Sequence, residues 1–116
     1  MLTAENFFPA LADTTRLRCL LLLATEGELC VCELTQALDV SQPKISRHLA
    51  MLRTLGIVSD RREGLWIHYR IHADLPPWAR TVLRSASQAN TAVKPFALDR
   101  KRLRGAPLRP PARCCV

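Results

Sequence analysis

Apolar residues recur every three to four positions over roughly the first half of the chain, which is the spacing of amphipathic helices. The pattern predicts a short helix at about 4–12 and a longer one at about 14–26. It also predicts a helix at about 31–38, a tight turn, and a further helix at about 42–55. The residues expected to begin or end these helices are Asp13, Gly27, Ser41 and Gly56.

The hydrophobic period changes in the segment 57–71, where every second residue from Ile67 to Ile71 is aliphatic or aromatic and the residues between are mostly polar. A period of two is typical of a strand with two different faces. The turn between two such strands is expected at Arg62-Glu63-Gly64. The segment therefore predicts a β-hairpin.

The rest of the chain divides into one more helix and a tail. A helical stripe begins near Pro76 and continues to about Ala89. Beyond Val93 the sequence is rich in Pro and Arg and has no helical stripe. We therefore expect a folded domain at 1–93 and a basic, flexible tail at 94–116 that ends in a Cys-Cys pair.

Two short helices joined by a tight turn, with a basic second helix and a hairpin after it, are the parts of a winged helix-turn-helix. The expected fold class is mainly α with a small β-hairpin. The net charge of +7 is unevenly spread. Residues 1–40 carry six acidic and two basic side chains, whereas residues 41–70 carry six basic and two acidic ones. Double-stranded DNA is the partner that this distribution favours, although a solvated basic surface would look the same.

The N-terminal half of a recognition helix normally faces the major groove. If Ile45 and Leu49 face the core, the other side chains of this stretch point outward. His48 can equally pack within the domain. The predicted DNA-contacting residues are Gln42, Lys44, Ser46, Arg47, His48 and, at the hairpin, Arg61 and Arg62.

The chain has five cysteines, an odd number that does not suit a disulfide framework. There is no leader-like segment and no apolar run long enough to span a bilayer, so a cytoplasmic location is expected. Thiols there are usually buried, metal-binding or redox-active. Cys19 lies among leucines and is expected in the core. Cys30 and Cys32 lie two apart at the start of the 31–38 helix.

Four segments together resemble the ArsR/SmtB family of metal-responsive bacterial repressors, in particular its arsenic-responsive members. They read 11-LADTTRLRCLLLL-23, 28-ELCVCEL-34, 41-SQPKISRHLAMLR-53 and 62-REGLWIHYRI-71. The resemblance implies a homodimer that binds a palindromic operator and leaves it when a thiophilic metal or metalloid binds. It also implies a dimer interface built from the first and last helices. The interface residues expected on these helices are Phe7, Phe8, Trp78 and Val82.

The resemblance further implies that Cys30 and Cys32 bind trivalent arsenic or antimony as inducer, with no cofactor required for DNA binding. Many members have a third cysteine where this chain has Thr35. Residues two apart on a helix point about 200° apart. Either Cys30 therefore lies just before the helix, or its first turn must unwind on binding. Cys114 or Cys115 is the candidate for an additional ligand.

Other readings of the cysteines stay open. A cadmium- or lead-responsive repressor of the same fold could recruit the tail cysteines, and a thiol-redox repressor could oxidise the pair instead of binding a metal. The zinc site that the family places on the last helix is not expected, because residues 75–93 contain neither His nor Asp. No motif of a thiol enzyme is present. A non-regulatory nucleic-acid binder would leave the cysteine pair unexplained.

Overall fold

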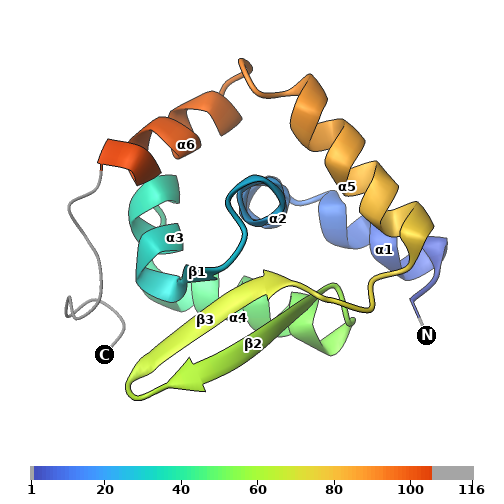
Figure 1. Ribbon diagram of the computed structural model, residues 1–116, viewed down its shortest axis with the longest axis horizontal. Coiled ribbons are helices and arrows are strands. Elements are labelled where there is room, and N and C mark those ends of the chain that lie inside the picture. Colours follow the sequence, from blue (N-terminus) through green and yellow to red (C-terminus); the bar gives the residue numbers. More distant parts are fainter. Residues whose placement is uncertain (1, 106–116) are drawn as a thin grey trace.

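The computed structural model describes residues 2–105 of the 116-residue chain. These residues form six helices and three short strands (Figure 1). In chain order they are α1 (Ala4–Leu11), α2 (Thr14–Glu26), β1 (Leu29–Cys30), α3 (Val31–Leu38), α4 (Gln42–Thr54), β2 (Val58–Glu63), β3 (Trp66–Ile71), α5 (Pro77–Ala89) and α6 (Phe96–Gly105). The predicted order of helices followed by a hairpin and a further helix is confirmed.

The helix ends follow the local chemistry of the sequence. Asp13 Oδ1 accepts a hydrogen bond of 3.0 Å from the Arg16 N–H and so caps α2. Gly27 ends the same helix with a φ of 86°, which glycine adopts without a steric penalty. Ser41 is the N-cap residue of α4, as expected, and Pro43 lies in the first turn of that helix.

Helix α2 is the centre of the molecule. Figure 1 shows it nearly end-on, with α3 and α6 on one side and α1 and α5 on the other. Its side chains from Cys19 to Leu23 are all buried and pack with apolar residues of every other helix. Cys19 is fully buried, which confirms its expected place in the core. No helix among residues 2–105 has the length and apolar character needed to cross a membrane.

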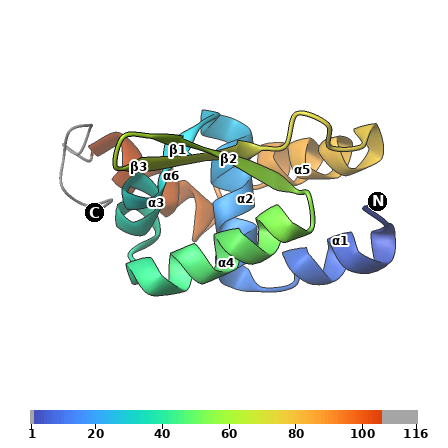
Figure 2. The ribbon, with the colours of Figure 1, turned by 90° about the horizontal axis from the view of Figure 1, so that it is seen from below.

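The sheet has three antiparallel strands in the order β1-β3-β2, not the two that the sequence predicted. Val58 pairs with Ile71 and Glu63 with Trp66 along the hairpin, while Cys30 pairs with His68 across β1 and β3. A two-residue strand has no detectable period, so the pattern could not predict β1. Its consequence is that the segment before α3 is tied directly to the hairpin. Figure 2 shows the hairpin of β2 and β3 along one side of the molecule and α4 along the opposite side.

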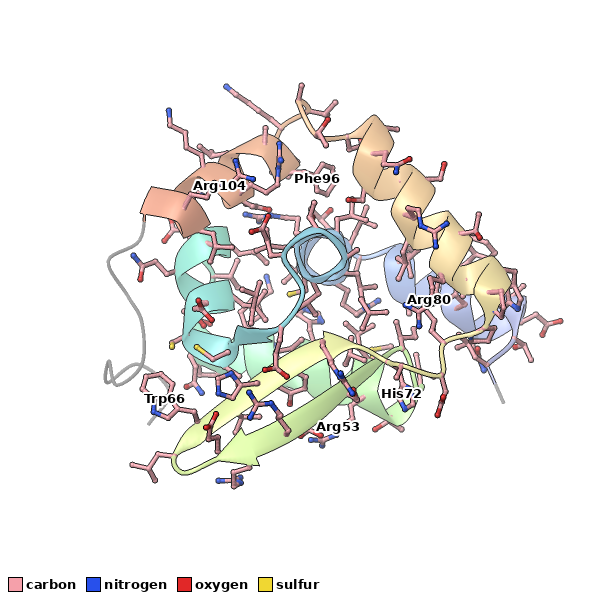
Figure 3. The ribbon with its side chains drawn as sticks, viewed as in Figure 1. Arg53, Trp66, His72, Arg80, Phe96 and Arg104 are labelled. Atoms are coloured by element: carbon pink, nitrogen blue, oxygen red, sulfur yellow. The ribbon has the colours of Figure 1, made fainter. Side chains whose placement is uncertain are left out.

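The prediction of a flexible tail from residue 94 onward is wrong for residues 96–105, which form α6. Only Leu103 of this helix is a buried apolar residue, so the sequence lacks the usual stripe. The helix is held by tertiary contacts with α3 and α2, including an ion pair of its buried Asp99. Phe96 points from α6 toward α2 (Figure 3). Residues 106–116, with Cys114 and Cys115, lie outside the described part.

Candidate functional site

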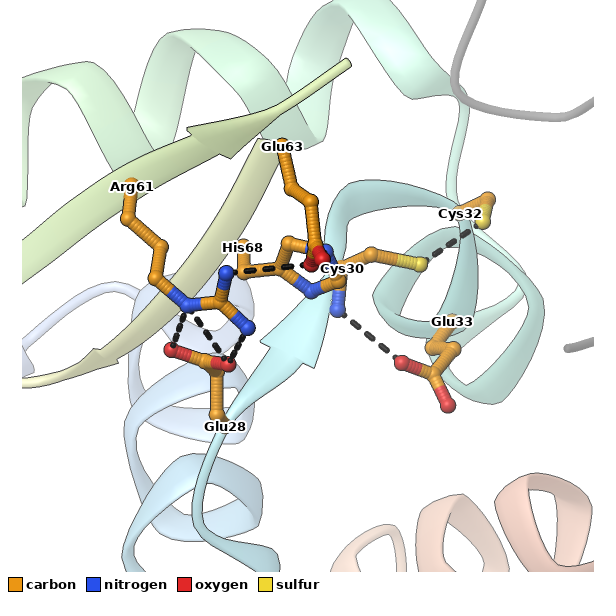
Figure 4. Close-up of polar contacts among 7 residues, drawn as sticks. All are labelled: Glu28, Cys30, Cys32, Glu33, Arg61, Glu63 and His68. Carbon is orange, nitrogen blue, oxygen red and sulfur yellow. Dashed lines mark hydrogen bonds and ion pairs between the residues drawn. The ribbon is translucent and has the colours of Figure 1, made fainter. Parts of the chain in front are cut away.

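The two cysteines of the motif converge at the start of α3. Cys30 is the last residue of β1 and the N-cap of α3, with extended backbone angles (φ −82°, ψ 163°), and Cys32 lies in the first helical turn. The two Sγ atoms are 2.8 Å apart (Figure 4). The extended backbone of Cys30 removes the 200° separation that two residues within a helix would have. The first of the two alternatives above is therefore the observed one, and no turn of α3 has to unwind.

The N-cap backbone of Cys30 is fixed by Glu33. The Cys30 N–H donates to Glu33 Oε1 at 3.0 Å, and the Cys30 side chain lies against the Glu33 N–H. Such a reciprocal arrangement is a capping box, with cysteine in the place usually taken by Ser or Thr. Both cysteines and Glu33 are buried. The Sγ of Cys30 is thus presented by a structured helix terminus rather than by a loop.

Thr35 occupies the position one turn after Cys32 but has a structural partner. Its Oγ1 donates to the Val31 carbonyl oxygen at 2.9 Å. A hydroxyl is also a poor ligand for a soft metalloid. Within residues 2–105, no set of three or more His, Cys, Asp or Glu side chains is arranged to hold a metal ion. The described part of the chain therefore brings two sulfur atoms together at the start of α3.

A cluster of polar side chains lies beside Cys30, formed by Glu28 and by the hairpin residues Arg61, Glu63 and His68 (Figure 4). Arg61 makes a bidentate pair with Glu28, with its closest nitrogen 2.6 Å from Oε1, and also contacts Glu63 at 3.1 Å. The hydrogen bond from Arg61 lowers the pKa of Glu28. His68, opposite Cys30, lies 3.7 Å from the Glu63 carboxylate. Sequence reasoning did not find this group, because it depends on the register of the three strands.

Arg61 and Arg62 do not lie at the tip of the hairpin, as the sequence suggested, but within β2. The turn instead lies at Gly64-Leu65, between Glu63 and Trp66. Arg61 forms ion pairs with the carboxylates of Glu28 and Glu63, and its contact with DNA stays a prediction. Arg62 alternates to the other face of the strand and is exposed.

Helix α4 has a polar outer face in its N-terminal half. Ile45 and Leu49 are fully buried, as expected. The side chains of Gln42, Lys44 and Arg47 are exposed, and Ser46 is half-buried beside Gln42, whose Nε2 lies 3.4 Å from the Ser46 hydroxyl. These four predicted DNA-contacting residues therefore share one accessible surface.

His48 faces the opposite way. Its side chain is only 12% exposed, its Nδ1 lies 3.4 Å from an Arg16 nitrogen, and its Nε2 is 3.8 Å from Asp13. Burial lowers the pKa of His48. Local packing of His48 is therefore observed, and a DNA contact by this residue stays a prediction.

The aromatic residues predicted for a dimer interface separate into buried and exposed members. Phe7 is fully buried and makes edge-to-face contacts with Phe8 and Trp78, at ring-centre distances of 5.3 and 5.2 Å. Phe8 is 48% and Trp78 40% exposed, while Val82 is half-buried. Phe7 therefore belongs to the protomer core and cannot itself contact a partner. Phe8 and Trp78 form an exposed aromatic surface where α1 meets α5.

Comparison with known proteins agrees with this geometry. The sequence profile described as "Bacterial regulatory protein, arsR family" matches residues 13–60. The chain is 57% identical over 90 residues to the arsenic resistance transcriptional regulator ArsR1 of Pseudomonas putida, covering 78% of this chain and 70% of the relative. It is 48% identical to ArsR2 of the same organism over 116 residues, covering 99% of this chain and all of the relative.

Among solved structures, the AntR antimony-specific transcriptional repressor superposes with a TM-score of 0.63 at 32% identity, covering 77% of this chain and 83% of that one. Full-length identity and shared fold together decide the classification. This chain belongs to the ArsR family of bacterial regulatory proteins, winged-helix DNA-binding transcriptional regulators that are not enzymes.

Proposed function

We propose that this protein is a cytoplasmic, homodimeric repressor that binds a palindromic operator through α4 and leaves it when trivalent arsenic or antimony binds Cys30 and Cys32. The observation that carries this proposal is the convergence of the two Sγ atoms, 2.8 Å apart, at the N-terminus of α3. Trivalent arsenic is soft and thiophilic, and two buried sulfur donors suit it better than a hard cation. The names of the arsenic- and antimony-responsive relatives support the same inducer class.

DNA binding is assigned to the exposed surface of Gln42, Lys44 and Arg47. Gln and Arg can form paired hydrogen bonds with base edges, while Lys more often contacts phosphates. A two-fold homodimer presents two copies of α4, so the operator should contain two half-sites about one helical turn, or a multiple of it, apart. The exposed aromatic surface of Phe8 and Trp78 is the proposed centre of the dimer contact.

Coupling between the sites can follow two routes from Cys30. As N-cap of α3, it begins the helix that leads through the turn at 39–41 into α4. As the last residue of β1, it is paired with His68 of the hairpin. Drawing the two sulfurs onto one arsenic atom would therefore displace both the recognition helix and the hairpin. Moving the operator-bound fraction from 99% to 1% requires a differential affinity of about 5.5 kcal/mol.

The test is release from a fluorescent operator duplex, followed by anisotropy during titration with arsenite. Wild type should dissociate, and Cys30→Ser with Cys32→Ser should remain bound at every arsenite concentration. Cys19→Ala is the matched control, because Cys19 lies in the core and should not affect release. Release of the double serine variant by arsenite would refute the assignment.

The same assay separates the alternative inducers. Release by cadmium or lead but not by arsenite would favour the cadmium- or lead-responsive reading. Release by peroxide without any metal, reversed by dithiothreitol, would favour a thiol-redox repressor. Both outcomes would keep the DNA-binding assignment and replace the inducer.

A further inference from the structure

We propose that the cleft between α2, β3 and α5 binds a small organic anion, whose phosphate or carboxylate group is held by arginines and whose apolar body lies against aliphatic side chains. The site is separate from the cysteine pair and from the recognition helix, so the inference goes beyond the proposed function. It does not depend on which inducer the cysteines bind.

The cleft measures about 730 Å³ and opens between the C-terminal end of α2, the end of β3, and α5. Small-molecule sites typically enclose roughly 300–1,000 Å³. Three aliphatic side chains line it, those of Leu23, Ile71 and Leu83. Ser87 and Gln88 add polar groups along the α5 side. The volume and the lining therefore suit a ligand that has both an apolar and a polar part.

Three arginines line the same cleft, namely Arg70 on β3 and, one helical turn apart on α5, Arg80 and Arg84. None of the three forms an ion pair with a carboxylate among residues 2–105. Like charges four positions apart on a helix weakly destabilise it, so helix stability does not account for the α5 pair. A guanidinium binds phosphate and carboxylate groups through paired N–H donors. The cleft therefore has the charge and the donors that an oxyanion requires.

Arg80 is already held in place within the cleft. Its Nη2 donates to the carbonyl oxygens of His72 and Ala73, at 2.9 and 3.1 Å. Figure 3 shows Arg80 on the side of α5 that faces the hairpin. A side chain that is fixed before binding loses less conformational entropy when the ligand arrives. Arg80 therefore supplies a preorganised positive charge, while the exposed Arg70 and Arg84 can approach the ligand from β3 and from α5.

One carboxylate, that of Glu28, also lines the cleft. The Arg61 guanidinium lies 2.6 Å from Glu28 Oε1 and 2.9 Å from Oε2, and Arg61 is not part of the cleft lining. The hydrogen bond from Arg61 lowers the pKa of Glu28, so this carboxylate is charged and already has its counter-charge. The cleft therefore keeps the excess positive charge of its three arginines.

The cleft stays accessible in the homodimer that we propose and on the operator. Residues two apart on a helix point about 200° apart. Arg80 lies two positions from both Trp78 and Val82, so the cleft and the proposed dimer contact use nearly opposite faces of α5. Figure 2 shows β3 and α5 on the side of the molecule away from α4. DNA bound to α4 would therefore leave the cleft uncovered.

Isothermal titration calorimetry of the full chain would compare 1-naphthyl phosphate, 1-naphthoate, inorganic phosphate and 1-naphthol. We expect at least one naphthalene anion to bind, and the tighter of the two identifies phosphate or carboxylate as the ligand group. Inorganic phosphate lacks the apolar body and 1-naphthol lacks the charge. Each of these two should therefore bind at least about 10-fold more weakly.

Two single variants test the arginines. Arg84→Gln and Arg70→Gln should each weaken binding of the tighter naphthalene anion by about 10- to 100-fold, the loss expected for one charge-assisted contact. Both side chains are exposed, so the midpoint of urea unfolding should stay the same. Arg104→Gln is the matched control, because it removes the same charge from an exposed position on α6. It should leave the affinity for the anion unchanged.

The inference would be overturned if neither naphthalene anion bound, if 1-naphthol or inorganic phosphate bound as tightly, or if Arg104→Gln weakened binding as much as Arg84→Gln. The slope of log operator affinity against log salt should be the same in Arg70→Gln and Arg84→Gln as in wild type. A slope reduced by about one would place these arginines on DNA phosphates and would also overturn the small-anion site. These results do not bear on release by arsenite, so the proposed function is tested separately.

Discussion

The Arg18–Asp99 ion pair should be the strongest single polar contact that holds α6 on the domain. The Arg18 side chain is 14% exposed and the Asp99 side chain 2%. Substituting Asp99→Ala removes both charge-assisted hydrogen bonds and leaves the guanidinium in a largely buried position, with the Leu38 carbonyl as its remaining partner. The change therefore removes one member of a buried pair and leaves the other member without its counter-charge.

The expected cost follows from this geometry. Breaking a buried pair by removing one partner typically costs about 3–5 kcal/mol. Arg18 retains one carbonyl bond and slight contact with solvent, so we expect about 3 kcal/mol, near the lower limit. In a chain of this size that corresponds to a fall in Tm of roughly 12 °C.

Urea unfolding followed by circular dichroism, at one fixed protomer concentration, would measure this free energy. The matched control is Asp60→Ala, which removes a similar 2.9 Å bond with Arg53 on the surface. Because Asp60 and Arg53 are 32% and 48% exposed, the control should change stability little. Arg18→Met combined with Asp99→Leu should recover most of the loss, because no buried charge remains.

The reasoning would be refuted if Asp99→Ala were no more destabilising than Asp60→Ala. A smaller urea m-value in Asp99→Ala with an unchanged midpoint would indicate a different result. In that case α6 would detach while the rest of the domain stayed folded, since m reports the surface exposed on unfolding.

Three further predictions concern single side chains. Burial raises the pKa of the Cys19 thiol to about 12. Iodoacetamide at pH 8 should therefore leave Cys19 unmodified in the native protein and alkylate it in urea. An adduct on native Cys19, detected by mass spectrometry, would contradict this burial. Burial lowers the pKa of His48 below its usual 6.5, so at mildly acidic pH the unfolded chain binds a proton that the folded chain does not. The free energy of unfolding should therefore fall as the pH drops below about 6.5. His48→Gln should flatten that part of the pH profile. Lys44→Gln should reduce the slope of log affinity for the operator against log salt by about one, measured by anisotropy in increasing KCl, and an unchanged slope would exclude a phosphate contact.

The local chemistry of the sequence was sufficient for most of the helices and for the fold class. Asp13 and Gly27 begin and end α2 by interactions within a few residues, and Ser41 lies at the N-cap position of α4, as its residue type predicts. A basic helix that follows a tight turn and precedes a hairpin then indicated a winged helix-turn-helix. The cysteine pair was also visible in the sequence, although its geometry was left between two alternatives.

Tertiary structure decided the features that depend on distant partners. Strand β1 exists because Cys30 pairs with His68, and the same pairing makes Cys30 an extended N-cap residue whose sulfur meets that of Cys32. Arg61 turns to Glu28, and His48 turns toward α2, for reasons of strand register and helix packing that no local pattern contains.

Helix α6 is the clearest difference between sequence and structure. Its composition is basic and its apolar stripe is reduced to little more than Leu103 and Phe96, so local propensity alone predicts a tail. It forms because α3 and α2 offer a surface with a buried cation, Arg18, which Asp99 neutralises from 81 positions away in the chain. Sequence patterns report the hydrophobic face of a helix, whereas an ion pair between distant residues becomes visible only when the fold has brought them together.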